Sequence, residues 1–242
     1  MIGTVAKSYI KGISCHTSFN RMITLHAVRY LTIDWNVGFD IMGHAIFMED
    51  GIERYNMISN NLLINIKRSM SLLNTDQTPA CVWMTGPMNN LVGNHAAGSD
   101  RYGFWYDLQI HSIGPSANTE ICPEGERMGE NRNNHAHSVG RYGTRIFHSM
   151  ISREKECELV PSYDGNNLDD PYHENRPYTD YFYNFTGWKN GRNCLIAKDV
   201  SDIRLHDFKC ADNLLAGVEI SVAKYYALGE PQVRGGLFIG KT

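Results

Sequence analysis

One short segment of the chain gathers side chains of the types that carry out acid–base chemistry. His44, Glu49, Asp50 and Glu53 lie in the sequence GHAIFMEDGIE, and Asp40 precedes it. Glycoside cleavage generally needs two carboxyl groups, one of them protonated, about 5–9.5 Å apart. In such a site His44 would carry a proton or hold an acid in place. The segment therefore predicts a candidate catalytic site of a glycoside-cleaving hydrolase.

A structural role accounts for the same residues. Asp50-Gly51 is a dipeptide that favours tight turns, and the Asp50 carboxylate would accept backbone N–H bonds at a corner of the chain. Glu49 and Glu53 would then be solvated acids beside that corner. We prefer this non-catalytic interpretation and keep the catalytic one as its alternative.

A second group of polar side chains lies in an acidic, amide-rich stretch. Its candidate metal ligands are Asp164, Asn166, Asp169 and Asp170. Carboxylate and amide oxygens are the ligands that calcium prefers, although this spacing does not match an EF-hand loop. A solvated loop without an ion is the favoured interpretation, and calcium is the only cofactor that the sequence suggests.

Aromatic and histidine side chains offer a third kind of site. The aromatic residues that could stack on sugar rings are Trp83, Trp105, Tyr106 and Trp188. The alternation of their neighbours places at least half of them inside the protein. His95 and His135 are expected to stack or face solvent at equivalent corners. The sequence contains no Gly-rich phosphate loop, G-x-S-x-G or H-E-x-x-H motif.

Short apolar runs must position these groups. Residues 45–48, 82–84 and 104–106 each follow a polar or glycine-containing turn, which is typical of strands. A repeated strand-and-turn unit buries its apolar face only by stacking on copies of itself. We predict an all-β fold, a right-handed single-stranded parallel β-helix (solenoid). Its long loop insertions are expected at residues 109–130 and 148–180.

Asparagine marks the corners of this predicted solenoid. The tripeptide Asn-His-Ala begins at Asn94 and again at Asn134, and each copy is followed by Arg-Tyr-Gly, at residues 101–103 and 141–143. Asparagine tolerates left-handed backbone geometry, and its amide can bond the equivalent amide one coil away. Asn36, Asn61, Asn94 and Asn134 are therefore predicted to form a corner ladder.

Composition limits the possible partners. The chain has 242 residues, a net charge of −3 and 20% charged residues, so no basic face for nucleic acid is indicated. No apolar run reaches the about 18 residues of a membrane-spanning helix. We take residues 1–242 as one domain and a fragment of a larger polypeptide. Its open ends predict self-association or stacking on neighbouring domains of the same polypeptide.

Cysteines and a glycosylation motif indicate an extracellular protein. The six cysteines are far apart and form no C-x-x-C pair, which favours disulfides for at least one pair over a zinc ribbon. Fifteen pairings are possible and the sequence does not choose among them. Asn184-Phe185-Thr186 is an N-glycosylation motif, so Asn184 is the predicted glycan carrier.

Longer segments resemble a known family. They are residues Gly43–Glu53, Ser71–Trp83, Asn89–Tyr106, Ile121–Pro123, Asn133–Gly143 and Phe185–Ser221. These segments look like the β-helix region of the fibrocystin and fibrocystin-L family. The cell-surface hyaluronidase and the hyaluronan-binding cell-migration-inducing protein are related to that family. They carry motifs similar to residues 43–53 and to NAAAGS, from which this sequence departs at His95.

The resemblance implies a place outside the cell, since family members are large extracellular or membrane-anchored glycoproteins associated with cilia and cell-surface coats. We expect a non-catalytic structural β-helix of a fibrocystin-like cell-surface or ciliary-coat glycoprotein. One form of this expectation is a β-helix that serves as a filament-forming repeat. The alternatives are a polysaccharide-cleaving, hyaluronidase-like β-helix and a glycan-binding one. Extracellular polysaccharide is the expected ligand in both alternatives.

Overall fold

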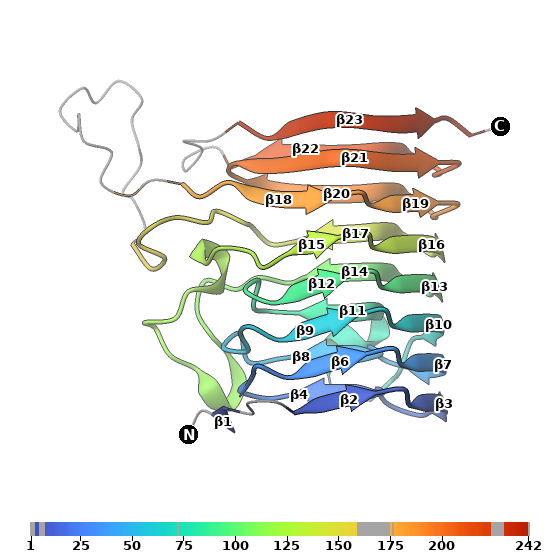
Figure 1. The fold of residues 1–242 in the computed structure, drawn as a ribbon, viewed down its shortest axis with the longest axis horizontal. Helices are drawn as coiled ribbons and strands as arrows, with labels where there is room; N and C mark the ends of the chain where they lie inside the picture. Colours follow the sequence, from blue (N-terminus) through green and yellow to red (C-terminus); the bar gives the residue numbers. More distant parts are fainter. Residues whose placement is uncertain are drawn as a thin grey trace.

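The computed structural model of the chain describes residues 3–4, 8–71, 73–158, 175, 177–223 and 230–241. They form coils that lie one above another, with the N-terminal strands at one end and β23 at the other (Figure 1). Each complete coil contributes one strand to each of three columns. The first column contains β2 (Tyr9–Lys11), β6 (Thr32–Asp34), β9 (Met57–Ser59), β12 (Asn90–Val92), β15 (Asn131–Arg132) and β18 (Asp180–Tyr183).

The second and third columns follow the same order. The second contains β3 (Ser14–Ser18), β7 (Val37–Met42), β10 (Leu62–Lys67), β13 (His95–Ser99), β16 (His135–Val139) and β19 (Thr186–Trp188). The third contains β4 (Ile23–Leu25), β8 (Ile46–Met48), β11 (Ala80–Met84), β14 (Tyr102–Tyr106), β17 (Tyr142–Ile146), β20 (Asn193–Val200) and β22 (Ala216–Val222). The long strands β21 (Ile203–Ala211) and β23 (Gln232–Ile239) extend across the first two columns.

Successive strands of a column pair in parallel, which confirms the predicted all-β parallel β-helix. Strands β1 (Gly3–Thr4) and β5 (Val28–Arg29) form a small separate parallel pair. Among the described residues, three short 3-10 helices lie in the connections: η1 (Asn74–Gln77), η2 (Gly114–Ser116) and η3 (Pro123–Gly125). Within the described residues, no helix is long and apolar enough to cross a membrane.

Side chains at equivalent positions of neighbouring coils form the core. In the first column Ile33, Ile58 and Leu91 lie in register, and none of them is exposed. In the third column Met48 and Met84 are aligned and equally buried. Burying one such side chain contributes about 1.5–3 kcal/mol. The stack therefore depends on keeping apolar residues in register from coil to coil.

The repeated Arg-Tyr-Gly tripeptides have a steric explanation. A Cβ atom on Gly103 would lie 2.5 Å from the carbonyl oxygen of Gly143, and one on Gly143 would lie 2.5 Å from that of Cys194. Such contacts are far shorter than carbon and oxygen tolerate, so glycine lets the strands of adjacent coils approach closely. The repeat thus reflects coil-on-coil packing in the third column.

The asparagine side chains lie one above another at the corner before the second column. Asn36 Nδ2 donates to Asn61 Oδ1 at 2.9 Å, Asn61 Nδ2 to Asn94 Oδ1 at 2.9 Å, and Asn94 Nδ2 to Asn134 Oδ1 at 3.1 Å. All four side chains are buried. Each oxygen also accepts the backbone N–H of the asparagine one coil earlier. The ladder therefore satisfies the polar groups of a buried corner.

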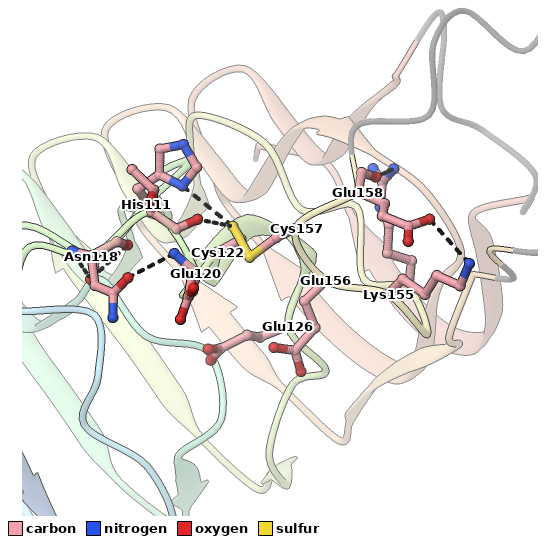
Figure 2. The surroundings of a disulfide bond; sticks show 12 residues. His111, Asn118, Glu120, Cys122, Glu126, Lys155, Glu156, Cys157 and Glu158 are labelled. Atoms are coloured by element: carbon pink, nitrogen blue, oxygen red, sulfur yellow. Dashed lines mark hydrogen bonds and ion pairs between the residues drawn. A yellow bond between two sulfur atoms is a disulfide. The ribbon is translucent and has the colours of Figure 1, made fainter.

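Two disulfides confirm the expectation of at least one cysteine pair. They join Cys122 to Cys157 and Cys194 to Cys210, while Cys15 and Cys81 are free. Figure 2 shows the first disulfide, which connects the parts of the chain containing Glu126 and Glu156. Disulfides persist in oxidising compartments, so the pairs fit an extracellular location.

Removing the disulfide between Cys194 and Cys210 is expected to lower the free energy of unfolding by about 3 kcal/mol, the chain-entropy value for a loop of this length. The two cysteines are separated by 16 residues. The double alanine variant should show this loss in urea denaturation, whereas the control Cys15→Ala should stay close to the parent. An unchanged urea midpoint in the double variant would contradict the prediction.

Three histidines gather on the second column. His95 is aligned with His135, and their ring centroids are 5.4 Å apart. His137 lies 5.1 Å from His95 and stacks on Trp188 at 4.3 Å. Burial lowers the pKa of all three, and repulsion from His95 adds to this for His135 and His137. The cluster is therefore built to hold neutral imidazoles.

We expect this cluster to weaken the fold in mild acid. Histidine in an unfolded chain has a pKa of about 6.5. The pKa values of the three histidines are lower in the folded protein. Their contribution to folding stability is therefore complete above the unfolded-state pKa, and it is lost as the pH falls towards the folded-state pKa values. The buried acids Glu126, Asp107 and Asp180 have raised pKa values, about 7, 6 and 6, and act in the opposite direction.

The measurement is therefore a difference between two proteins. The gap in melting temperature between the parent and His137→Gln should narrow from pH 7.5 to pH 5.5, because only the parent must keep this imidazole neutral. The exposed His16 provides the matched control, since His16→Gln should follow the parent at every pH. A gap that does not change with pH would count against the prediction.

Candidate functional site

The corner after β8 brings three of the predicted acids together. Glu49, Asp50 and Glu53 follow that strand, and His26 joins them from the preceding coil, directly after β4. His26 Nδ1 lies 3.0 Å from Asp50 Oδ1 and 3.6 Å from Glu49 Oε2. The imidazole and Glu49 are partly open to solvent, whereas Asp50 is buried.

Glu53 supports the backbone of this corner. Its Oε1 accepts N–H bonds from Ala27 at 2.9 Å and from Asp50 at 3.2 Å, and its Oε2 accepts the N–H of Gly51 at 2.9 Å. The side chain is fully buried, and burial raises its pKa, although the N–H groups of Ala27 and Asp50 oppose the shift. Glu53 is not the solvated acid that the structural interpretation of the sequence expected.

Asp50 is held from the other side by the insertion at residues 109–130. Ser116 Oγ donates to Asp50 Oδ2 at 2.6 Å, and the N–H of Ile113 donates to the Asp50 carbonyl at 2.9 Å. The other carboxylate oxygen of Asp50 faces His26. One oxygen of the carboxylate is thus fixed by the loop, and the second points towards the open side of the corner.

His44 belongs to a different cluster, at the opposite end of β8. It is fully buried, its Nδ1 accepts the N–H of Ala80 at 3.1 Å, and its Nε2 lies 3.9 Å from Asp76 Oδ1. Arg21 forms an ion pair with Asp76 at 3.1 Å. Burial and the charge of Arg21 keep the pKa of His44 well below its usual range. The structure therefore places His44 beside Asp76, and Asp40 pairs with Lys67.

An acid that the sequence interpretation missed lies two coils beyond Glu49. Glu49 directly follows strand β8, and Asp107 directly follows strand β14. Both strands pair with β11, which lies between them in the third column. Two strand spacings correspond to roughly 9.6 Å between their backbone positions. Burial raises the pKa of Asp107 to about 6, and the charge of Arg145 opposes this shift. Arg145 itself lies 4.5 Å over the ring of Trp105.

The predicted sugar-stacking residues are mostly interior. Trp83, Trp105 and Tyr106 are buried, while Trp188 is half-buried against His137. Some of the exposed aromatic rings lie in or beside the first column. There Tyr55, Tyr181 and Tyr183 help to line a groove of about 440 Å³. Tyr181 and Tyr183 stack with their centroids 5.6 Å apart.

The two remaining predicted sites are the glycosylation site and the calcium site, and the structure describes only the first of them. Asn184 is half-buried, its Nδ2 donates to Asn133 Oδ1 at 2.8 Å, and its Oδ1 accepts from Lys209 Nζ at 3.2 Å. The suggested calcium ligands Asp164, Asn166, Asp169 and Asp170 lie outside the described residues.

Fold and site together define a disulfide-bonded parallel β-helix with acidic corners beside its third column. The family model described as CEMIP beta-helix matches residues 1–144. The chain belongs to this family of β-helix domains.

Curated relatives agree with this assignment and with the predicted resemblance. Fibrocystin-L of Mus musculus is 45% identical over 141 residues, covering 58% of this chain and 3% of the relative. Fibrocystin-L of Homo sapiens is 35% identical over 216 residues, covering 88% and 5%. The cell surface hyaluronidase CEMIP2 of Homo sapiens is 35% identical over 166 residues, covering 57% and 12%. The chain thus spans only a small part of the relatives it matches.

Proposed function

We propose that this chain is a non-catalytic structural β-helix segment of a fibrocystin-like extracellular glycoprotein of the cell surface or the ciliary coat. The observation that supports this role is the use of the corner acids. Glu53 is fully buried and accepts three backbone N–H bonds, and Asp50 is fixed by Ser116. Both oxygens of Glu53 and one oxygen of Asp50 are thus engaged in stabilising the corner.

Exposed edges suggest how such a segment would assemble. Val233, Leu237, Phe238 and Ile239 of the strand β23 are between 44% and 55% exposed. An exposed apolar strand is a surface on which another strand pairs. In this proposal residues 1–242 form one β-helix unit that stacks on a neighbouring part of the same polypeptide or on a second copy, as in a filament. Asn184 would carry its glycan.

The test is to incubate the secreted chain with hyaluronan and other glycosaminoglycans between pH 4 and pH 7 and to follow their molar mass by size-exclusion chromatography. A structural segment leaves the size distribution unchanged. Depolymerisation by the purified chain that disappears in a Glu49→Gln or Asp107→Asn variant would overturn the proposal.

Cleavage of a polysaccharide is the second candidate, and Asp107 favours it. A carboxyl group with a pKa of about 6 can donate a proton at mildly acidic pH, and Glu49 would be the second carboxylate. Their backbone separation of roughly 9.6 Å is close to the upper end of the carboxyl spacing in inverting glycosidases. The relatives include a protein named as a cell surface hyaluronidase.

The candidate enzyme makes a sharp prediction for single substitutions. Asp107→Asn and Glu49→Gln should each abolish cleavage, whereas Glu120→Gln, on an exposed part of the 109–130 insertion, should cleave like the parent. Cleavage that survives both substitutions would exclude this pair of acids.

A further inference from the structure

His26, Glu49 and Asp50 form a group of donors that comes from two adjacent coils. One ligand atom from each residue lies within 4.8 Å of the others. Among the described residues, this is the group in which three such donors are so close. The donors are one imidazole nitrogen and two carboxylate oxygens, and all three are of types that bind metal ions.

The spacing of the donors suits a small ion. Zinc binds histidine nitrogen at about 2.0–2.1 Å and carboxylate oxygen at about 2.0–2.2 Å, so two donors on a tetrahedral ion lie roughly 3.3–3.5 Å apart. The distances from His26 Nδ1 to the Asp50 and Glu49 oxygens are 3.0 and 3.6 Å, on either side of this value. Both distances from the imidazole nitrogen thus suit a tetrahedral ion, and all three donor atoms lie within 4.8 Å of one another.

The surroundings hold one of these donors in place before any ion arrives. Ser116 Oγ donates to Asp50 Oδ2 at 2.6 Å, and Glu53 fixes the backbone N–H groups of Asp50 and Gly51. Hydrogen bonds of this kind orient ligating carboxylates in metal sites. His26 and Glu49 have side chains that are 48% and 21% exposed, so the fourth position faces water.

We propose that His26, Glu49 and Asp50 bind a divalent transition-metal ion of the zinc class. Two carboxylates balance the charge of a divalent cation, and a neutral imidazole completes the set. Calcium and magnesium prefer oxygen donors alone, so the imidazole selects against them. The ion would tie the corner of the first coil to that of the second and to the loop that contains Ser116.

The experiment is isothermal titration of the chelator-treated protein with zinc chloride, accompanied by melting curves with and without the metal. The expected result is one ion per chain, a higher melting temperature with zinc, and no comparable effect of calcium. His26→Gln should weaken zinc binding at least tenfold. Because His26 is exposed, this variant is expected to fold, and Glu49→Gln should repeat its effect.

The histidine cluster on the second column supplies the matched control. His137→Gln removes one imidazole from the cluster that also contains His95, His135 and Trp188. This substitution should leave the affinity for zinc unchanged. Affinity that is lost in His137→Gln and retained in His26→Gln would assign the ion to that cluster and overturn the proposal. Absence of stoichiometric binding by the parent would overturn it as well. Neither result bears on glycan cleavage, so this proposal and the proposed structural function fail independently.

Discussion

Replacing Asn94 with alanine is expected to lower the free energy of unfolding by about 3–6 kcal/mol, because buried polar groups lose their partners at about 1–3 kcal/mol each. Asn94 Oδ1 accepts the backbone N–H of Asn61 at 3.2 Å and its Nδ2 at 2.9 Å. Asn94 Nδ2 donates to the Ile58 carbonyl at 2.8 Å. Alanine leaves the Asn61 N–H without this acceptor and removes a donor from the Ile58 carbonyl inside the stack.

Urea denaturation followed by circular dichroism measures this loss. Asn90 is the matched control, because it lies in the same coil and accepts one exposed bond, from the N–H of Glu130 at 2.7 Å. Asn90→Ala should cost no more than about 1.5 kcal/mol, the net value of an ordinary hydrogen bond. A small domain has a total stability of about 5–15 kcal/mol, so Asn94→Ala removes a large part of it. Equal losses in both variants would show that the ladder is not important for stability.

The fold could be predicted because its local signals repeat along the chain. Short apolar runs give strands without knowledge of their partners, and the Asn-His-Ala copies at Asn94 and Asn134 give the coil register directly. A second pair of stacked asparagines, Asn56 and Asn89, escaped notice although Asn56 Nδ2 donates to Asn89 Oδ1 at 2.9 Å. Their signal was present, since each precedes a residue of the predicted ladder by the same interval.

The site was less predictable because its residues meet across coils of unequal length. Asp50 and His26 are 24 residues apart, whereas Asn94 and Asn134 are 40 apart, so no fixed interval points from one coil to the next. Proximity in the sequence also misleads. His44 precedes β8 and Asp50 follows it, so the extended strand keeps the two residues apart. Asp107 becomes a candidate only when the register of β8, β11 and β14 is known.

Glu53→Ala should destabilise the protein by at least about 3 kcal/mol, since three donors lose their acceptor and each unpaired buried donor costs about 1–3 kcal/mol. The backbone N–H groups of Ala27, Asp50 and Gly51 donate to its carboxylate and would all lose their acceptor. Glu53→Gln should lose less. Its amide oxygen can still accept at one position, but its NH₂ group meets a donor at the other. The expected order of stability is therefore parent, glutamine variant, alanine variant.

The order of stability of the parent and the two Glu53 variants distinguishes an acid that supports the corner from a catalytic acid. A catalytic carboxyl is commonly replaced by its amide with little loss of stability, whereas a carboxylate that accepts bonds at both oxygens loses stability with either substitution. Glu49 gives the comparison within the same corner, because its side chain is 21% exposed and pairs with His26 only at 3.6 Å. Glu49→Ala should cost less than about 1 kcal/mol, as expected for a solvent-accessible ion pair. If Glu53→Gln melts like the parent, the acid does not hold the corner, and the structural function proposed for this segment loses its main support.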